Sequence, residues 1–178
     1  MDMKNMMMFA GVAAALAACA SPTGVKVPEV LAPTDAEMPA MAVRARGVQI
    51  YECRAKPGAA PEWAFVAPDA ELFDVRGHPA GHHGAGPVWQ ARDGSVIRGA
   101  VKARADAPVA GAIPWLLLSA KAEGPEGSFS RVSSIQRLNT VGGVAPSDGC
   151  DRSTVGKSAR VEYTADYVFF STQKRSRT

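Results

Sequence analysis

All three histidines of this 178-residue chain fall in one short stretch, His78-Pro79-Ala80-Gly81-His82-His83. Imidazole is a common ligand for zinc and copper, and Asp74 or Asp93 could complete a coordination set. His78, His82 and His83 are therefore candidate metal ligands. The alternative is an irregular polar loop with exposed histidines, which the four glycines within residues 77–86 favour.

A second group of residues could recognise an organic ligand. Trp89 offers an aromatic surface, while His83, Asp93 and Arg137 offer hydrogen-bonding groups, a combination that suits sugars, peptides and other small molecules. The alternative is structural, with the tryptophan in a core and the aspartate in a turn. The chain has no Gly-x-Ser-x-Gly elbow and no Gly-x-Gly-x-x-Gly motif, so we expect neither a hydrolase of that type nor a dinucleotide cofactor, and indeed no cofactor.

The N-terminus contains a cysteine in a position that could accept a lipid. Lys4 precedes an uncharged, mostly apolar run from Met6 to Ala18. A membrane-spanning helix needs about 20 apolar residues, whereas a secretory signal needs fewer. The run ends in Leu16-Ala17-Ala18-Cys19, which resembles the lipobox of bacterial lipoproteins. The alternative is an ordinary signal peptide that is cleaved after small residues and followed by an incidental cysteine.

The lipobox resemblance implies that residues 1–18 are a signal peptide and that Cys19 is lipidated. Two or more acyl chains anchor a protein stably, so the membrane is the expected partner. Ala20 and Ser21 follow the cysteine, and the absence of an aspartate there indicates the outer membrane. We expect a protein of the cell envelope that faces the periplasm or the exterior. Prolines at 22, 28, 33 and 39 predict a flexible linker over residues 19–41.

Two further cysteines, Cys53 and Cys150, remain once Cys19 is set aside. Export would place them in an oxidising compartment, and their spacing is not that of a zinc or redox motif. We expect a disulfide between them; two buried free thiols are the alternative.

The pattern of residues 42–172 has a period of two, which indicates strands. From Val161 to Phe169 the odd positions are apolar, and Glu162, Thr164 and Asp166 alternate with them. Similar runs occur at 48–53, 63–66, 96–104 and 131–138, and the run 113–118 is apolar on both faces.

The expected fold class is therefore all-β, a single antiparallel β-sandwich or barrel-like domain. In the run 96–104 we expect Ile97, Val101 and Ala103 to face inward and Arg104 to face outward. Asp93-Gly94 predicts a hairpin whose two central residues both have positive φ.

Composition sets limits on the partners. The net charge of +3 is small and the basic residues are scattered, so we expect no nucleic acid partner. Residues 173–178 form a short basic tail, which we interpret as a solvated terminus.

Several stretches occur together in a distinctive order: Gly47–Cys53, Gly86–Trp89, Asp93–Ser95, Ile113–Leu118, Ile135–Gly143, Cys150 and Tyr163–Tyr167. In this order they resemble the secreted family of bacteria and fungi called domain of unknown function 3455, from about residue 44 to 170. The resemblance implies no established activity. One position departs from it, because the family has an aromatic residue after the histidine matching His83, where this chain has Gly84.

These observations favour a non-catalytic, membrane-anchored module that binds a small molecule, a glycan or an envelope protein. One alternative is an enzyme, metal-dependent or otherwise, that uses the region of His82, His83 and Asp93. The other alternative is a purely structural envelope protein. A pocket in which His83, Trp89 and Arg137 converge would favour binding or catalysis, and a filled interior would favour the structural role.

Overall fold

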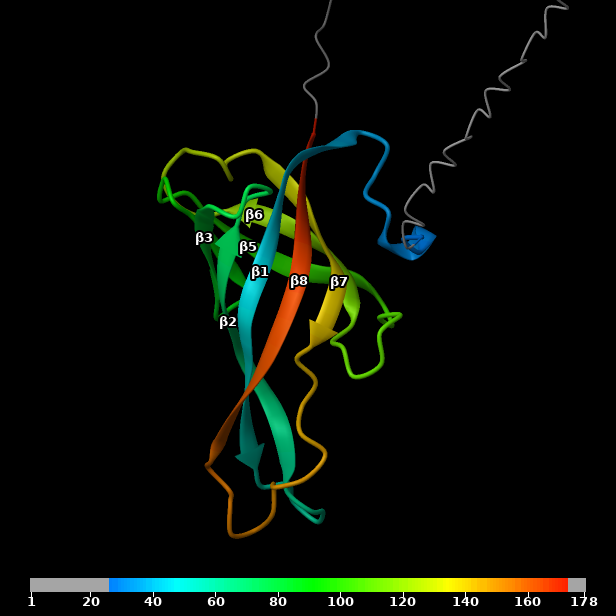
Figure 1. Ribbon diagram of the computed structural model, residues 1–178, viewed down its shortest axis with the longest axis vertical. Helices are drawn as coiled ribbons and strands as arrows, with labels where there is room; N and C mark the ends of the chain where they lie inside the picture. Colours follow the sequence, from blue (N-terminus) through cyan, green and yellow to red (C-terminus); the bar gives the residue numbers. More distant parts are fainter. Residues whose placement is uncertain (1–25, 173–178) are drawn as a thin grey trace, which may run out of the picture.

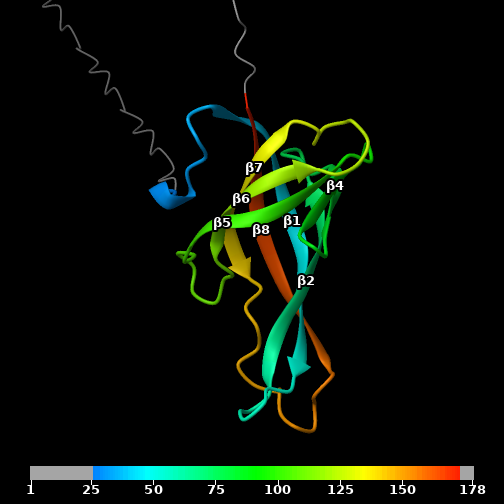
Figure 2. The ribbon, with the colours of Figure 1, turned by 180° about the vertical axis from the view of Figure 1, so that it is seen from behind.

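The computed structural model describes residues 26–172, and these form one closed antiparallel barrel of eight strands (Figures 1 and 2). The all-β prediction is confirmed, and of the two architectures left open the barrel is the one observed. Within the described range no helix is long and apolar enough to cross a membrane. The elements are η1 (Glu29–Leu31), β1 (Glu37–Arg54), β2 (Glu62–Phe73), β3 (Pro79–Gly84), β4 (Val88–Ala91), β5 (Val96–Ala105), β6 (Trp115–Ala122), β7 (Val132–Gly142) and β8 (Ser158–Thr172).

Each strand pairs with the next along the chain, and β8 returns to pair with β1. The closing ladder is long, from Glu37 opposite Thr172 to Glu52 opposite Ser158. In Figures 1 and 2 the strands β1, β2 and β8 extend well beyond the other five at one end of the barrel. The long hairpin of β1 and β2 therefore continues past that end.

The alternation predicted for the last strand is confirmed. Tyr163, Ala165, Tyr167 and Phe169 of β8 are buried, and they face the barrel interior. Phe129, from the connection between β6 and β7, packs on Phe169 with the ring centres 4.8 Å apart. Apolar side chains from every strand thus fill one part of the interior as a common core.

Strand β6 is apolar on both faces, as the sequence predicted, and each face packs against a different group of residues. Leu116 and Leu118 belong to the interior core. Trp115 and Leu117 lie on the outer face, in a second buried cluster with Leu31. A strand of this kind is stable only if something covers its outer side.

The cover is the N-terminal segment, so the predicted linker over residues 19–41 is too long. The side chain of Leu31 in η1 is completely buried, and its carbonyl oxygen accepts a hydrogen bond of 2.6 Å from Gln136 Nε2. Strand β1 then begins at Glu37. Proline spacing alone suggested a coil, whereas burial of Leu31 gives the segment a fixed position. Cys19 and the basic tail, residues 173–178, lie outside the described residues.

A β-bulge in β5 changes which residues face inward. The pairing with β6 shifts between Val101 and Ala103. A bulge adds one residue and exchanges the faces of the strand beyond it. Ala103 consequently joins the outer cluster and Arg104 turns toward the interior, the reverse of the prediction for both residues.

Most of the glycine-rich histidine stretch forms strand β3, so the loop interpretation was wrong for His82 and His83, while His78 lies in the exposed turn before the strand. Gly81 pairs with Ala91 of β4, and a Cβ atom at Gly81 would lie 2.1 Å from the Gln90 carbonyl oxygen. The glycine is therefore needed for close approach of two strands, which sequence alone does not distinguish from a loop.

The hairpin predicted at Asp93-Gly94 is confirmed between β4 and β5, but its turn differs. Ala91 N donates to Ser95 O at 2.9 Å, which leaves three residues in the loop. Of the two predicted residues only Gly94 has positive φ, at 86°. This is the geometry of a three-residue loop with a glycine bulge.

The predicted disulfide between Cys53 and Cys150 is confirmed. It joins the end of β1 to the connection between β7 and β8, and the two cysteines are 97 residues apart in the sequence. A crosslink that closes so long a loop restricts the unfolded chain strongly.

Removing the Leu31 side chain tests whether the N-terminal segment is part of the folded domain. We expect Leu31→Ala to lower the free energy of unfolding by about 2–4 kcal/mol, because a fully buried leucine leaves a cavity. Urea denaturation followed by fluorescence measures the change. Val30→Ala is the matched control, since Val30 is 58% exposed and its loss should cost less than about 0.5 kcal/mol. Equal effects of both variants would show that the segment is not docked.

Candidate functional site

A cavity of about 510 Å³ lies beside the packed core and is open to solvent, since its lining residues Phe65, Val66 and Val101 are exposed. Its walls come from all eight strands, from the β3–β4 turn and from the connection between β5 and β6. The lining residues are Gln49, Tyr51, Phe65, Val66, Pro68, His83, Gly86, Pro87, Trp89, Val101, Arg104, Ile113, Pro114, Leu116, Leu118, Arg137 and Tyr167. Most of these side chains are apolar or aromatic, and a few are polar, which is the usual composition of a small-molecule site.

Three of the four residues that the sequence singled out for ligand binding converge on this cavity. His83 of β3, Trp89 of β4 and Arg137 of β7 all line it. The fourth, Asp93, does not. Its carboxylate accepts hydrogen bonds from the backbone and hydroxyl groups of Ser95 and Ser128. Asp93 therefore holds the β4–β5 turn against the connection between β6 and β7. These bonds hold the pKa of Asp93 below its usual range.

His83 is held in one orientation and one protonation state. Its ring stacks on Trp89 with the centres 4.0 Å apart and meets the edge of Tyr167 at 5.3 Å. Nδ1 lies 2.9 Å from Val88 O, and because a carbonyl oxygen can only accept, Nδ1 carries the proton and Nε2 is an acceptor. Burial, reinforced by the nearby Arg137 charge, lowers the pKa of His83 to about 3. The ring is therefore neutral at neutral pH.

Arg137 brings a positive charge to the cavity wall. Its Nε and Nη2 donate to the carbonyl oxygen of Pro114 at 3.0 and 2.8 Å, which fixes the plane of the guanidinium group. A carbonyl oxygen is neutral, so these bonds orient the charge without cancelling it. No aspartate or glutamate of the described chain lies within ion-pair distance of Arg137, and none lines the cavity.

Several buried donors at the interior form no well-aligned hydrogen bond within the described chain: Gln49 Nε2, Trp89 Nε1, Tyr163 OH and Tyr167 OH. The two hydroxyls lie near each other, with Gln49 beside Tyr163 and Arg137 beside Tyr167. Burial raises the pKa of both tyrosines, so both hydroxyls keep their protons. An unpartnered buried donor costs about 1–3 kcal/mol, which favours water or a ligand beside it. Tyr51 differs, since its hydroxyl donates to Gly143 O at 2.6 Å.

Sequence reasoning missed Gln49, Tyr51, Arg104 and Tyr167 as site residues. Tyr167 was placed correctly on the inward face but was interpreted as apolar core. Gln49 and Tyr51 occupy the same face of β1 as Cys53, so the period of two contained a signal for them. Nothing in the sequence indicated Arg104, because its direction depends on the bulge in β5.

The remaining histidines serve local contacts outside the cavity. His82 Nε2 lies 3.0 Å from Asp69 Oδ1, and this bond, together with Arg160, lowers the pKa of Asp69. The backbone of His78 donates to Asp74, which closes the turn before β3. Over residues 26–172, no three histidine, cysteine or acidic side chains form a group that could hold a metal ion. The structure therefore does not bring His78, His82 and His83 together as ligands.

Gly84, the position where the family has an aromatic residue, faces away from the cavity. A Cβ atom there would lie 3.1 Å from His82 Cε1, on the outer face of β3. An aromatic side chain at this position would therefore cover His82 and would not line the site.

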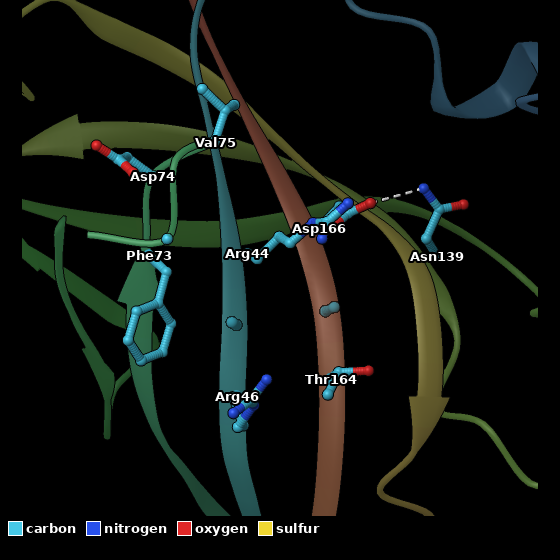
Figure 3. Close-up of a pocket in the computed structure, with 11 residues that line it drawn as sticks. Arg44, Arg46, Phe73, Asp74, Val75, Asn139, Thr164 and Asp166 are labelled. Atoms are coloured by element: carbon cyan, nitrogen blue, oxygen red, sulfur yellow. Dashed lines mark hydrogen bonds and ion pairs between the residues drawn. The ribbon is translucent and has the colours of Figure 1, made fainter. Parts of the chain in front are cut away.

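A second hollow of about 490 Å³ lies on the outer wall of the barrel, over β1 and β8 (Figure 3). Asp166 accepts a hydrogen bond of 2.8 Å from Asn139 and lies 3.7 Å from Arg44 Nε. The Arg44 side chain is 82% exposed. Exposed and paired charges bind a further ligand weakly, so the interior cavity is the stronger candidate.

The neutral state of His83 makes stability depend on pH. The unfolded chain binds a proton near pH 6.5 and the folded chain only near pH 3, so stability falls as pH drops between these values. We expect a loss of about 2 kcal/mol from pH 7 to pH 5 that His83→Gln abolishes, measured by urea denaturation. His78→Gln, an exposed control, should keep the loss. An identical pH dependence in His83→Gln and the unsubstituted chain would contradict this assignment.

Comparison with known proteins gives a family but no function. The family described as "Protein of unknown function (DUF3455)" matches residues 33–171, which includes every residue of the cavity and all eight strands except the last residue of β8. No curated protein and no solved structure matches the chain significantly. The match begins before β1 and so includes part of the segment that sequence analysis had assigned to a linker. The chain is thus a member of the DUF3455 family.

Proposed function

We propose that this protein is a non-catalytic binding module that takes one small, largely apolar molecule into the barrel cavity. The observation that carries the proposal is a 510 Å³ cavity whose walls contain unpartnered buried donors. An eight-stranded barrel has room for side chains alone or for one small ligand. Because space remains beside oriented hydrogen-bond donors, we infer that this barrel holds a small ligand.

The aromatic side chains of the cavity wall suit a planar ligand. His83 and Trp89 form a nearly parallel stack, with an angle of 8° between their rings. Leu116 and Leu118 supply apolar surface from β6, and Gln49 and Tyr167 supply hydrogen bonds. These groups sit on strands, so their positions are fixed before a ligand arrives, which reduces the entropy lost on binding.

This proposal is favoured over the two alternatives. The enzyme hypothesis required His82, His83 and Asp93 to act together, whereas His82 pairs with Asp69 on the outer face of β3 and Asp93 bonds to Ser95 and Ser128. A purely structural protein would gain stability from a filled interior, because an unfilled cavity and unpartnered donors both lower the free energy of unfolding.

We further propose that the domain is anchored to a membrane of the cell envelope through a lipid on Cys19. The sequence Leu16-Ala17-Ala18-Cys19 is the basis. The Cys53–Cys150 disulfide supports it, since such bonds persist in oxidising compartments outside the cytoplasm. The outer membrane is the proposed site, and the ligand would then be a molecule of the periplasm or the exterior.

Blocking the cavity tests the binding function. We expect N-phenyl-1-naphthylamine, a neutral dye that fluoresces in apolar surroundings, to bind the protein saturably and one to one. Val101→Trp places a large side chain in the cavity wall and should weaken dye binding at least about tenfold. Val75→Trp, at an 84% exposed position, is the control and should leave affinity unchanged. Failure of the dye to bind, or equal binding by both variants, would refute the proposal.

Metabolic labelling tests the anchor. Cells that express the chain with a labelled fatty acid should yield labelled protein in the membrane fraction. Cys19→Ala should abolish the label and release the protein from that fraction, because the thiol that accepts the lipid is gone. Cys19→Ala should leave the Cys53–Cys150 disulfide intact. Label retained in the Cys19→Ala variant would exclude Cys19 as the attachment site.

A further inference from the structure

Two arginines stand in one row of side chains across the cavity wall. In the register of the barrel, Leu116 of β6 lies opposite Arg104 of β5 on one side and Arg137 of β7 on the other. Tyr167 of β8 continues the row beside Arg137. Residues directly opposite in neighbouring antiparallel strands point to the same face. All four therefore face the cavity, and all four line it.

The charge of this row is not balanced by the protein. Neither Arg104 nor Arg137 forms an ion pair with another residue in the range 26–172. The cavity lining contains two arginines and no carboxylate. Arg137 is half-buried, and a buried or half-buried positive charge is usually compensated by an anion, which here has to come from outside the described chain. Arg104 is exposed and adds its charge at the edge of the same row.

The orientation of Arg137 suits an anion with a planar group. Two of its nitrogens, Nε and Nη2, are held by the Pro114 carbonyl oxygen. Nη1 does not take part in these two bonds, and the Tyr167 hydroxyl lies beside the guanidinium group. A guanidinium group fixed in this way loses little entropy when it binds a carboxylate, and charge-assisted bonds of this type are stronger than neutral ones.

The neutral groups around the two arginines also favour a ligand that has hydrogen-bond acceptors. Gln49 Nε2, Trp89 Nε1 and Tyr167 OH are donors without partners. The neutral His83 ring adds no further positive charge to those of the two arginines. A ligand that carries oxygen acceptors at one end and an apolar ring at the other would meet both the donors and the aromatic wall.

We propose that the ligand of the cavity is an aromatic carboxylate, whose anionic group binds Arg137 and Arg104 and whose ring lies against the His83–Trp89 wall. This inference rests on the proposed binding function and specifies the chemical class of the ligand. Charge and shape are separable in experiment, because the same ring can carry an anionic, a neutral or a cationic substituent.

Three naphthalene probes test the proposal: 2-naphthoate, 2-naphthalenemethanol and 2-naphthylmethylammonium. Titration calorimetry would use the full chain with Cys19→Ala, which removes the need for detergent. We expect 2-naphthoate to bind at least about tenfold more tightly than the alcohol, and the ammonium probe to bind weakest, since arginine attracts the anion and repels the cation.

Substitution of the arginines assigns the effect to them. Arg137→Gln should weaken 2-naphthoate at least about tenfold and change alcohol binding less than about twofold, with Arg137→Lys intermediate. Arg104→Gln, at an exposed position, should weaken 2-naphthoate without disturbing the fold. Arg46→Gln is the control, because Arg46 is exposed on the outer face of β1 (Figure 3).

The possible failures are distinguishable. If the alcohol binds as tightly as 2-naphthoate, or if Arg137→Gln weakens both probes equally, the cavity binds ligands but the anion inference is wrong. If none of the three probes binds while the protein shows its cooperative unfolding transition, the binding function and the inference built on it both fall.

Discussion

The pairing of β8 with β1 is the constraint on which the rest of the structure depends. Before closure, the eight strands would form an open sheet with two unpaired edges and one apolar face in water. The ladder from Glu37–Thr172 to Glu52–Ser158 removes both edges at once. It also turns the inward face of every strand into the wall of an enclosed space. The disulfide between Cys53 and Cys150 lies at the end of this ladder, where β1 and the chain entering β8 meet.

Closure contributes to the chemistry of the site because the two closing strands supply several of its polar groups. Gln49 and Tyr51 come from β1, and Tyr167 comes from β8. Strands β3 and β4 supply the stack of His83 on Trp89, and β5 and β7 supply Arg104 and Arg137. Each of these side chains reaches the interior only because the alternation of its strand, with the bulges included, directs it there. The outer face of β6 also helps to fix the site, since Trp115 and Leu117 pack under the N-terminal segment and hold that strand in place.

Much of this architecture could be predicted from the sequence, and the failures have definite causes. The period of two predicted the inward face of β8, and the apolar run 113–118 predicted that both faces of β6 are buried. The Asp93-Gly94 pair predicted the hairpin between β4 and β5. Strand β3 was missed because glycines needed for close packing look like loop glycines. Arg104 was missed because the direction of a side chain after a bulge depends on the pairing partner.

The N-terminal segment was missed for a related reason, since Leu31 has no periodic neighbours and only tertiary burial fixes it. For the site, sequence reasoning found His83, Trp89 and Arg137, whose side chains combine polarity with an inward position. It wrongly added Asp93, whose carboxylate serves a turn. Residue type indicated which groups could bind a ligand, but only the register indicated which of them share a cavity.

The tyrosines of β8 give the strongest indication that stability alone did not shape this interior. Phenylalanine at position 163 or 167 would fill the same space and would remove a buried hydroxyl that has no partner within the described chain. Such a replacement is expected to be neutral or stabilising, because an unpartnered hydroxyl costs about 1–3 kcal/mol. The same argument applies to Gln49, for which an apolar residue would serve packing equally well. Tyr167 and Gln49 line the cavity, and polar side chains that lower the stability of the barrel there are understandable if the cavity has a ligand to hold.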